Sequence, residues 1–412
     1  MYRVSAYIRH FAWALLAGVG VATLWVNLSP ASYYDFIEWR LVDLPLPALL
    51  SPFPISLTPL VLVSDGLMAI FVFFIGKELW EALVLERGAL SGGRALVPMA
   101  GMFGGMLGAI LVWGLTSMLF ETAIEATPGI GWQVPLGSDV VLAYVFGRWI
   151  FGPGHPALHV LLLITIASDI LGLLLAGLSD PASVLRLAWL VLPLLATAAA
   201  WWFFGRSPAK GAPELIRRRA MLLWPYVLAG GISYFGVAAS GLPAALGLLP
   251  ILPAIPHAES AFGLFAEAEE FLADPMNRLA HALVTPLFAV LFLFGLTRGG
   301  IDLLALAPTS FSVLAALWIG KPAGLLIGVA LARRLFGARA QDIAGLSGRD
   351  YLLIAGISGA AFTIPVLAIE TALPGGGMAE AARLGLGLSL LAGPVTYGLA
   401  KALPDPAAKR HG

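Results

Sequence analysis

The chain has 412 residues, of which 59% are hydrophobic and only 12% are charged, whereas a soluble domain carries about 25% charged residues. Its formal net charge is zero, so nothing favours a nucleic acid as partner, and it has no cysteine, which excludes disulfides and thiolate metal sites. We therefore predict an all-α polytopic membrane protein that sits in the lipid bilayer.

About twelve apolar stretches are candidate membrane spans, and no soluble domain interrupts them. In chain order they are Arg9–Leu28, Leu57–Val84, Ala95–Phe120, Pro135–Phe146, Pro156–Leu178, Ser183–Phe204, Met221–Ala239, Leu242–Ile255, Arg278–Leu296, Pro308–Leu331, Tyr351–Leu373 and Ala382–Ala402. The first ends without a signal-peptide cleavage pattern, so we expect it to be retained. Residues 1–412 are predicted to form a single transmembrane domain, in which a basic loop at 206–219 joins segments 1–205 and 220–412.

Lysine and arginine gather in alternate loops and in the tail, which predicts how the chain is oriented across the membrane. These basic positions are Lys77, Arg87, Arg94, Arg148, Arg206, Lys210, Arg217–Arg219, Arg278, Arg333, Arg334, Arg339, Arg349, Lys401, Lys409 and Arg410. The opposite loops and span ends contain only Arg40, Arg186, Arg298 and Arg383. We therefore expect a multi-pass protein of a bacterial-type cytoplasmic (inner) membrane, with both termini in the cytoplasm.

The segment His257–His281 departs from the apolar pattern. It gathers Glu259, Glu267, Glu269, Glu270 and Asp274. Three phenylalanines between these acidic residues give it an apolar side. A helix at the membrane interface and a solvated acidic loop are both open interpretations.

Asp169 lies near the middle of the apolar stretch Pro156–Leu178. It follows Pro156 by 13 residues, which corresponds to roughly 20 Å of helix. An ionised aspartate at such depth costs on the order of 3 kcal/mol, and chains rarely keep one without a partner, a water-filled cavity and a function. Asp169 is therefore the first candidate for a proton or cation site.

Two spans in opposite halves of the chain are interrupted. Asp139 follows Pro135 and Gly137 in a short span, which predicts a broken helix that lines a cavity or is buried in protein. The stretch Gly356–Pro365 contains two glycines, Thr363 and a proline where a helix is expected. Paired interruptions of this kind are the best sequence indication of a transporter site built from half-helices near the middle of the membrane.

Lys321 is the third polar group at membrane depth. It precedes the basic end of its span by 12 residues, roughly 18 Å, so its ammonium cannot easily reach the surface and needs a carboxylate. With Asp139 and Asp169 it would form a centre where protonation and cation binding compete, which is antiport in its simplest form. Asp65, Glu78 and His281 are weaker candidates for a funnel or for a response to pH.

At these residues the chain resembles the NhaA family of sodium/proton antiporters, nearly from end to end. The motifs that carry the resemblance are SDGLMAIFVFFIGKEL with Glu78, RALVPMAGMFGGM, WQVPLGSDVVLAY with Ser138 and Asp139, IGKPAG with Lys321, and GISGAAFTIPVLAIE with Thr363. This family is itself one of those from which the rule about paired interrupted helices was drawn.

The resemblance implies twelve spans with inverted repeats and two crossed discontinuous helices. It also implies proton-coupled Na⁺ or Li⁺ exchange by alternating access, an acidic funnel on the inner side, and a role in sodium transport and pH homeostasis. The family has two adjacent aspartates where this chain has Asp169 and Ile170. The ungapped register places Ile170 on the second aspartate, the main ion ligand, and a hard cation loses an oxygen there.

Three interpretations follow. In the first, the protein exchanges protons for Na⁺ or another monovalent cation. Asp169 is then the titrating acid and a Na⁺ ligand, and Lys321 is its counter-charge. Asp139 neutralises the half-helix ends, and Ser138 and Thr363 offer further oxygens. In the second, an NhaA-like homologue moves another substrate or senses pH without transport, because of Ile170. The third is an intramembrane hydrolase with Asp139 and Asp169 as a dyad, which a buried lysine disfavours. We expect that the protein is not an enzyme and binds no cofactor. A homodimer is one assembly that it could form.

Overall fold

The structure, a computed structural model, describes residues 7–43, 56–84, 92–120, 130–180, 184–205, 221–256, 274–337 and 346–403. These residues are helical apart from loops and two short strands, β1 (Val42–Asp43) and β2 (Ser56–Leu57), which pair antiparallel. The all-α prediction is therefore confirmed. The predicted basic loop 206–219 and most of the acidic segment 257–281 lie outside the described residues.

The helices follow one another along the chain as the apolar stretches predict. Those of the first half are α1 (Tyr7–Leu28), α2 (Pro30–Ile37), α3 (Pro59–Val61), η2 (Leu62–Leu67), α4 (Met68–Val84), η3 (Gly92–Ala95), α5 (Leu96–Phe120), η5 (Val134–Leu136), α6 (Val140–Phe151), α7 (Pro156–Leu178), η6 (Leu187–Leu190), α8 (Val191–Ala200) and η7 (Trp201–Gly205). Those of the second half are α10 (Trp224–Ala239), η8 (Ala244–Leu246), η9 (Leu249–Ala254), α11 (Pro275–Arg298), α12 (Pro308–Ala315), η11 (Ala316–Gly320), α13 (Lys321–Phe336), α14 (Gly348–Ser358), α15 (Thr363–Ala372), α16 (Gly376–Ser389) and α17 (Ala392–Ala402).

Within the described ranges, eight helices are long and apolar enough to cross a membrane, and α14 with α15 forms a ninth candidate span bent by 51°. Together with α10, the short helices at 244–254 and the α16–α17 pair, they account for all twelve predicted spans. The predicted span Leu242–Ile255 differs from expectation, because it consists of two short 3₁₀ helices. Pro243, Pro250 and Pro253 explain this, since proline lacks the N–H that a continuous α-helix needs.

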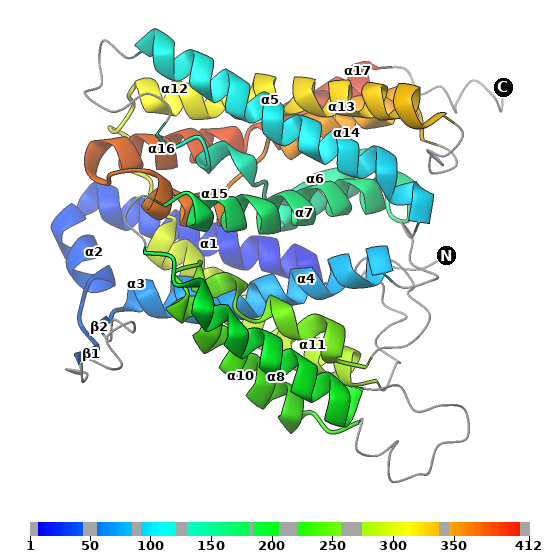
Figure 1. Ribbon diagram of the computed structural model, residues 1–412. Helices are drawn as coiled ribbons and strands as arrows, with labels where there is room; N and C mark the ends of the chain where they lie inside the picture. Colours follow the sequence, from blue (N-terminus) through cyan, green and yellow to red (C-terminus); the bar gives the residue numbers. More distant parts are fainter. Residues whose placement is uncertain are drawn as a thin grey trace.

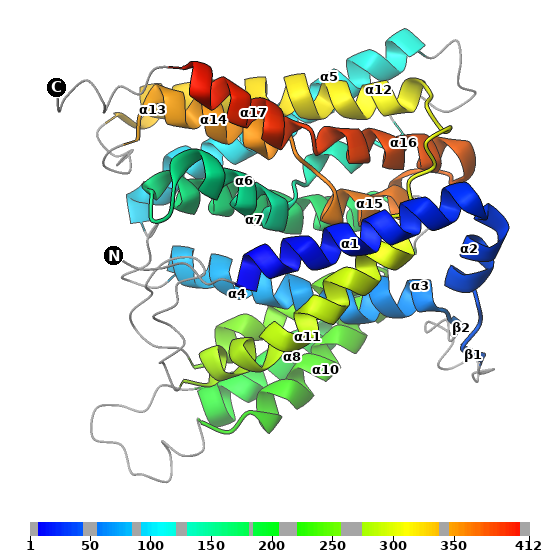
Figure 2. The same cartoon turned by 180° about the vertical axis from the view of Figure 1, so that it is seen from behind.

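The helices pack in two groups (Figures 1 and 2). The first, which we call the α1 group, contains α1, α4, α8, α10 and α11 with their short connecting helices, and the second, the α5 group, contains α5 to α7 and α12 to α17. The groups meet where α1 packs against α6 and where α4 packs against α7. Chain position does not decide membership, since each group draws on both halves of the sequence.

Two ends of the bundle can be distinguished. The chain enters α1 and leaves α17 at one end, which we call the termini end, and α2 lies at the opposite end, the far end (Figure 1). Helices α1 and α11 both run from the termini end to the far end, because Gly18 contacts Leu296 while Asn27 contacts Ile301. The position of a residue along a helix therefore shows which end of the bundle the residue is nearer.

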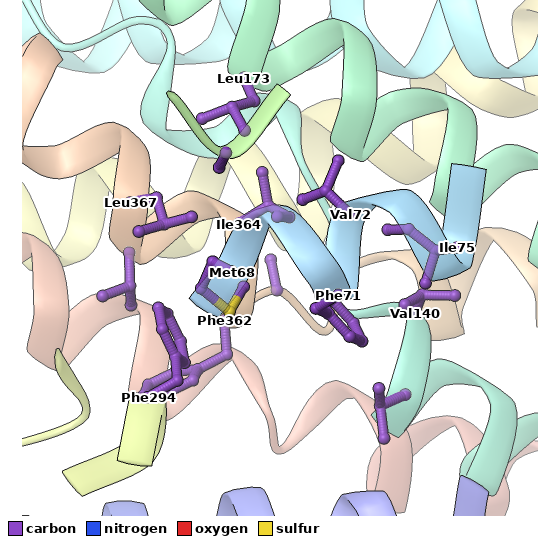
Figure 3. Packing of buried hydrophobic residues seen from close by; sticks show 14 of the residues in the cluster. Met68, Phe71, Val72, Ile75, Val140, Leu173, Phe294, Phe362, Ile364 and Leu367 are labelled. Carbon is purple, nitrogen blue, oxygen red and sulfur yellow. The ribbon is translucent and has the colours of Figure 1, made fainter. Parts of the chain in front are cut away.

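Apolar side chains fill the seam between the two groups (Figure 3). Met68 and Phe71 of α4 and Phe294 of α11 come from the α1 group, while Phe362 and Ile364 come from the interrupted span of the α5 group. All five side chains are at most 2% exposed. Packed hydrophobic side chains thus fill this part of the seam.

Helices α5 and α13 cross in close contact through glycines. A Cβ atom on Gly108 would lie 2.1 Å from the carbonyl oxygen of Gly320, and one on Gly324 would lie 2.1 Å from that of Gly104. Small residues let membrane helices approach closely. In a membrane, close packing rather than the hydrophobic effect holds helices together. The α5 group therefore depends on these glycines.

We expect Gly108→Val to destabilise the protein, because a side chain there must push α13 away. Overpacking costs about 1–3 kcal/mol, so the melting temperature should fall by about 1–4 °C. Gly114→Val on the same helix is the matched control, since no atom lies within 4 Å of a Cβ at Gly114. Thermal unfolding of both purified variants in detergent checks this, and equal melting temperatures would contradict it.

Candidate functional site

The two interrupted spans cross each other at their breaks. In one, residues 137–139 are extended between η5 and α6; in the other, residues 359–362 separate α14 from α15. The amide of Asp139 donates to the carbonyl oxygen of Ala360 at 3.0 Å, which joins the breaks directly. The predicted pair of crossed discontinuous helices is therefore present, and backbone ends of both signs meet inside the bundle.

Asp139 caps two helices at once. Its Oδ1 accepts from the amide of Leu142 at 2.9 Å in the first turn of α6. Its Oδ2 accepts from the amide of Thr363 at 3.1 Å and from the Thr363 hydroxyl, at the start of α15. Because both helix N-termini carry partial positive charge, a fully buried carboxylate is stabilised there. Both oxygens of Asp139 are thus committed to structure.

Lys321 is the first residue of α13. Its side chain contacts the C-terminal end of η5, whereas Asp139 contacts N-terminal helix ends. Its Nζ donates to the carbonyl oxygens of Leu136 at 2.9 Å and Gly137 at 2.5 Å, and to the hydroxyl of Ser138 at 2.7 Å. These carbonyls end η5, where the partial charge is negative. The side chain is 2% exposed, and its three donors are satisfied by the break.

Asp169 of α7 has one engaged and one free oxygen. Its Oδ1 accepts from the amide of Ser138 at 2.6 Å, while its buried Oδ2 has no hydrogen-bond partner among the residues that the structure describes. No ion pair within 4.0 Å joins it to Lys321, although the structure describes both residues; Ser138 contacts both instead. Ser138 also donates to the carbonyl oxygen of Ser358 at 3.2 Å and so touches the second break. Asp169 Oδ2 is therefore the oxygen at this centre that can take a proton or a cation.

Glycines bring α7 up against the first break. A Cβ on Gly137 would lie 3.0 Å from Asp169 Oδ1, and one on Gly172 would lie 3.2 Å from the amide of Gly137. Ile170 is half-buried and packs against the largest apolar cluster. Helix α7 therefore presents a single carboxylate to the centre, and the following side chain adds no oxygen.

The weaker candidates are not gathered at this centre. Asp65 lies in the π-helical turn η2 toward the far end, and Glu78 lies near the termini end of α4, 13 residues later, which is roughly 20 Å. Glu78 is buried and lies 3.2 Å from Lys77 Nζ, which also contacts Glu81 at 2.8 Å. His281 is exposed on α11.

Sequence reasoning missed three buried charges. It counted Lys77 only as a loop cation and did not consider Glu81, although their spacing of four residues places them on one helix face. It counted Arg298 only as an outer-side charge, whereas the side chain is 6% exposed. Among the described residues, no three acidic or histidine side chains form a group that could hold a metal ion.

The chain is similar to known proteins over nearly its whole length. The model of the family "Na+/H+ antiporter 1" matches residues 8–399. A Na⁺/H⁺ antiporter NhaA of Jannaschia sp. is 36% identical over 400 residues, which are 93% of this chain and 94% of that protein. Na⁺/H⁺ antiporter NhaA 2 of Pelobacter propionicus is 31% identical over 389 residues, with 93% and 94% covered. A Na⁺/H⁺ antiporter NhaA of Geotalea uraniireducens is 31% identical over 402 residues, with 96% of each covered.

Proposed function

This chain belongs to the Na⁺/H⁺ antiporter 1 family, and we propose that the centre formed by Asp169, Ser138, Asp139, Thr363 and Lys321 is where it exchanges protons for Na⁺. The resemblance to NhaA-type antiporters is thereby confirmed. The protein is a secondary transporter and not an enzyme, so the hydrolase interpretation falls. The transported ions are its substrates, and the family requires no cofactor.

The observation that carries the proposed mechanism is the free Oδ2 of Asp169. A buried carboxylate is more stable protonated or beside a cation than as a bare anion, so H⁺ and Na⁺ compete for one oxygen. Asp139 takes no part in this competition, because both of its oxygens accept hydrogen bonds from helix ends. Its fixed charge, together with Lys321, holds the crossed breaks in place.

The orientation is also a proposal. The distribution of lysine and arginine supports a protein of the cytoplasmic membrane, with both termini in the cytoplasm. The termini end would then face the cytoplasm and the far end would face outward. Glu78, buried near the termini end, is suited to the mouth of an inner funnel, whereas Asp65 belongs to the outer side.

We expect electroneutral exchange, because one carboxylate oxygen trades one proton for one Na⁺. In proteoliposomes with a sodium gradient, proton movement by the wild type should change less than about twofold when a potassium–valinomycin clamp imposes about 100 mV, since no net charge crosses the field. Ile170→Asp adds a second carboxylate and should make exchange sensitive to the potential. Li⁺ serves as a second test cation.

The same experiment tests the proposed function. Sodium-driven proton movement above that of protein-free liposomes supports exchange. Its absence from the wild type and appearance in Ile170→Asp would instead favour the homologue with an altered substrate. A wild type that already follows the potential would contradict the single-carboxylate stoichiometry.

A further inference from the structure

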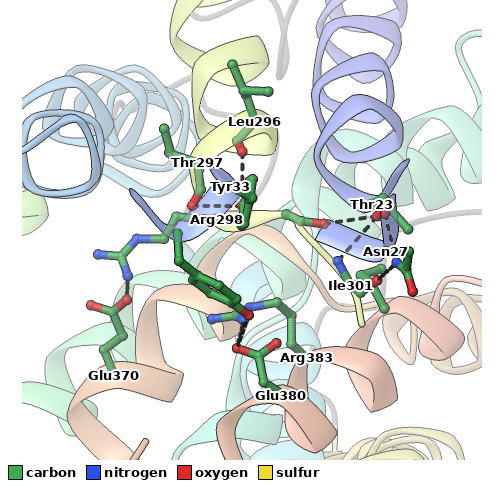
Figure 4. A network of polar contacts seen from close by, with 12 residues as sticks. Thr23, Asn27, Tyr33, Leu296, Thr297, Arg298, Ile301, Glu370, Glu380 and Arg383 are labelled. Carbon is green, nitrogen blue, oxygen red and sulfur yellow. Dashed lines mark hydrogen bonds and ion pairs between the residues drawn. The ribbon is translucent and has the colours of Figure 1, made fainter. Parts of the chain in front are cut away.

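A polar network lies at the far end of the seam (Figure 4). Arg298, the last residue of α11, forms an ion pair with Glu370 of α15. Its Nε donates to the hydroxyl of Ser64 in η2 at 2.5 Å. The guanidinium is buried, while Glu370 is exposed, with 42% of its side chain accessible. A buried cation at this end needs an explanation, because burying a charge is unfavourable unless it is paired.

Arg298 is held firmly within the α1 group. Tyr33 of α2 donates to the carbonyl oxygens of Leu296 and Thr297, at 3.1 and 3.2 Å, and so fixes the last turn of α11. Asn27 of α1 donates to the carbonyl oxygen of Ile301 at 2.7 Å and fixes the segment that follows. The network therefore positions the guanidinium from three elements of one group.

Glu370 belongs to the other group. Helix α15 packs against α7, α16 and η5, which are all parts of the α5 group. Glu370 lies seven residues after Thr363, about two helical turns on the far-end side of the Asp139 contact. The Arg298–Glu370 pair thus crosses the seam between the groups, on the helix that leads to the candidate ion site.

A second contact crosses the seam at the same end. The hydroxyl of Tyr34 in α2 donates to Glu380 Oε1 of α16 at 3.0 Å, and Arg383 Nη1 lies 2.6 Å from the same oxygen. Figure 4 shows that both carboxylates and both guanidinium groups lie in one neighbourhood. Two polar contacts therefore tie the α1 group to the α5 group where the chain faces outward in the proposed orientation.

We propose that Arg298 and Glu370 form the outer gate of the exchanger, which is closed in this conformation. The proposal rests on the exchange function and orientation proposed above. Alternating access requires the site to be closed to one side while it is open to the other. The ion pair closes the outer side in two ways: it joins the two groups, and its guanidinium places a fixed positive charge in the path of a cation. Opening separates Glu370 from Arg298.

Labelling from outside tests the gate without relying on transport. Leu367 lies on α15 between Thr363 and Glu370 and is 9% exposed. In the otherwise cysteine-free chain, Leu367→Cys should react slowly with a membrane-impermeant maleimide added outside. Arg298→Gln in that background should raise the labelling rate about fivefold or more, because an amide cannot hold Glu370 by charge. The swapped pair Arg298→Glu with Glu370→Arg should bring the rate back toward its original value. Equal rates in all three proteins would overturn the gate.

Cross-linking tests whether the pair must separate. Arg298→Cys with Glu370→Cys, joined by a reversible bis-methanethiosulfonate linker, should lose sodium-driven proton movement at least tenfold and regain it on reduction. The control joins two residues within the α1 group, Trp25→Cys and Ser32→Cys, and should keep its exchange. Cross-linked protein that still exchanges at the control's rate would show that the pair is a static strut. Absence of exchange from the wild type would contradict the proposed function, but the labelling result would still decide the gate.

Discussion

Asp169→Asn should reduce sodium-driven proton movement to the level of protein-free liposomes. The asparagine amide cannot release a proton and carries no charge to compensate Na⁺, so both competing states of Oδ2 disappear. The variant should still fold, because an amide oxygen can accept the hydrogen bond that the Ser138 amide now donates to Oδ1. Loss of exchange with an unchanged fold would assign the chemistry to this carboxylate.

The measurement is proton movement across proteoliposomes after a step in external Na⁺ or Li⁺. Asp169→Glu is the matched control, because it keeps the acid and shifts it by one methylene; we expect it to exchange with reduced apparent affinity. Melting temperatures of both variants check that the centre is intact. Residual exchange above about a tenth of the wild-type rate in Asp169→Asn would contradict a mechanism with Asp169 as the single exchanging carboxylate. It would indicate that Asp139 takes part in exchange.

Sequence predicted the spans, and the polar residues that lie together at the breaks, because both stand out by composition. A stretch with almost no charge must be an apolar helix, and Asp139, Asp169 and Lys321 stand out against such stretches. Proline and glycine marked the breaks around Gly137 and Gly359 for the same reason. The predicted span at 242–255, which consists of short 3₁₀ helices, also has a readable cause in its three prolines.

Sequence could not predict which polar atoms meet. Lys321 was expected to pair with a carboxylate, but its contacts are two backbone carbonyls and a hydroxyl. Helical periodicity could not predict this, because a break in another span leaves those carbonyl groups without helical partners. The contact between Asp139 and Thr363 joins positions 224 residues apart. Arg298 looked like a surface charge because the burial of a helix end depends on what packs over it.

Lys321→Met should destabilise the protein strongly and abolish exchange. The methionine fills similar volume but leaves the carbonyls of Leu136 and Gly137 and the hydroxyl of Ser138 without their shared donor. Each buried polar group left unsatisfied costs about 1–3 kcal/mol. The segment that presents the Ser138 amide to Asp169 would then shift, so the acid loses its position even though its side chain is unchanged. Thermal unfolding and sodium-driven proton movement measure the two effects.

A double-mutant cycle separates positioning by Lys321 from simple charge balance. If Lys321 only offset the charge of Asp169, then Asp169→Asn would remove the need for it and restore the stability of Lys321→Met. The geometry predicts no such rescue, because the carbonyls of Leu136 and Gly137 lose the donor that Lys321 Nζ supplies whether aspartate or asparagine stands at 169. Lys401→Met is the matched control, since Lys401 is exposed on α17 and its variant should melt within about 2 °C of the wild type. Full recovery of stability in the double variant would show that charge, and not the support of the break, is what Lys321 supplies.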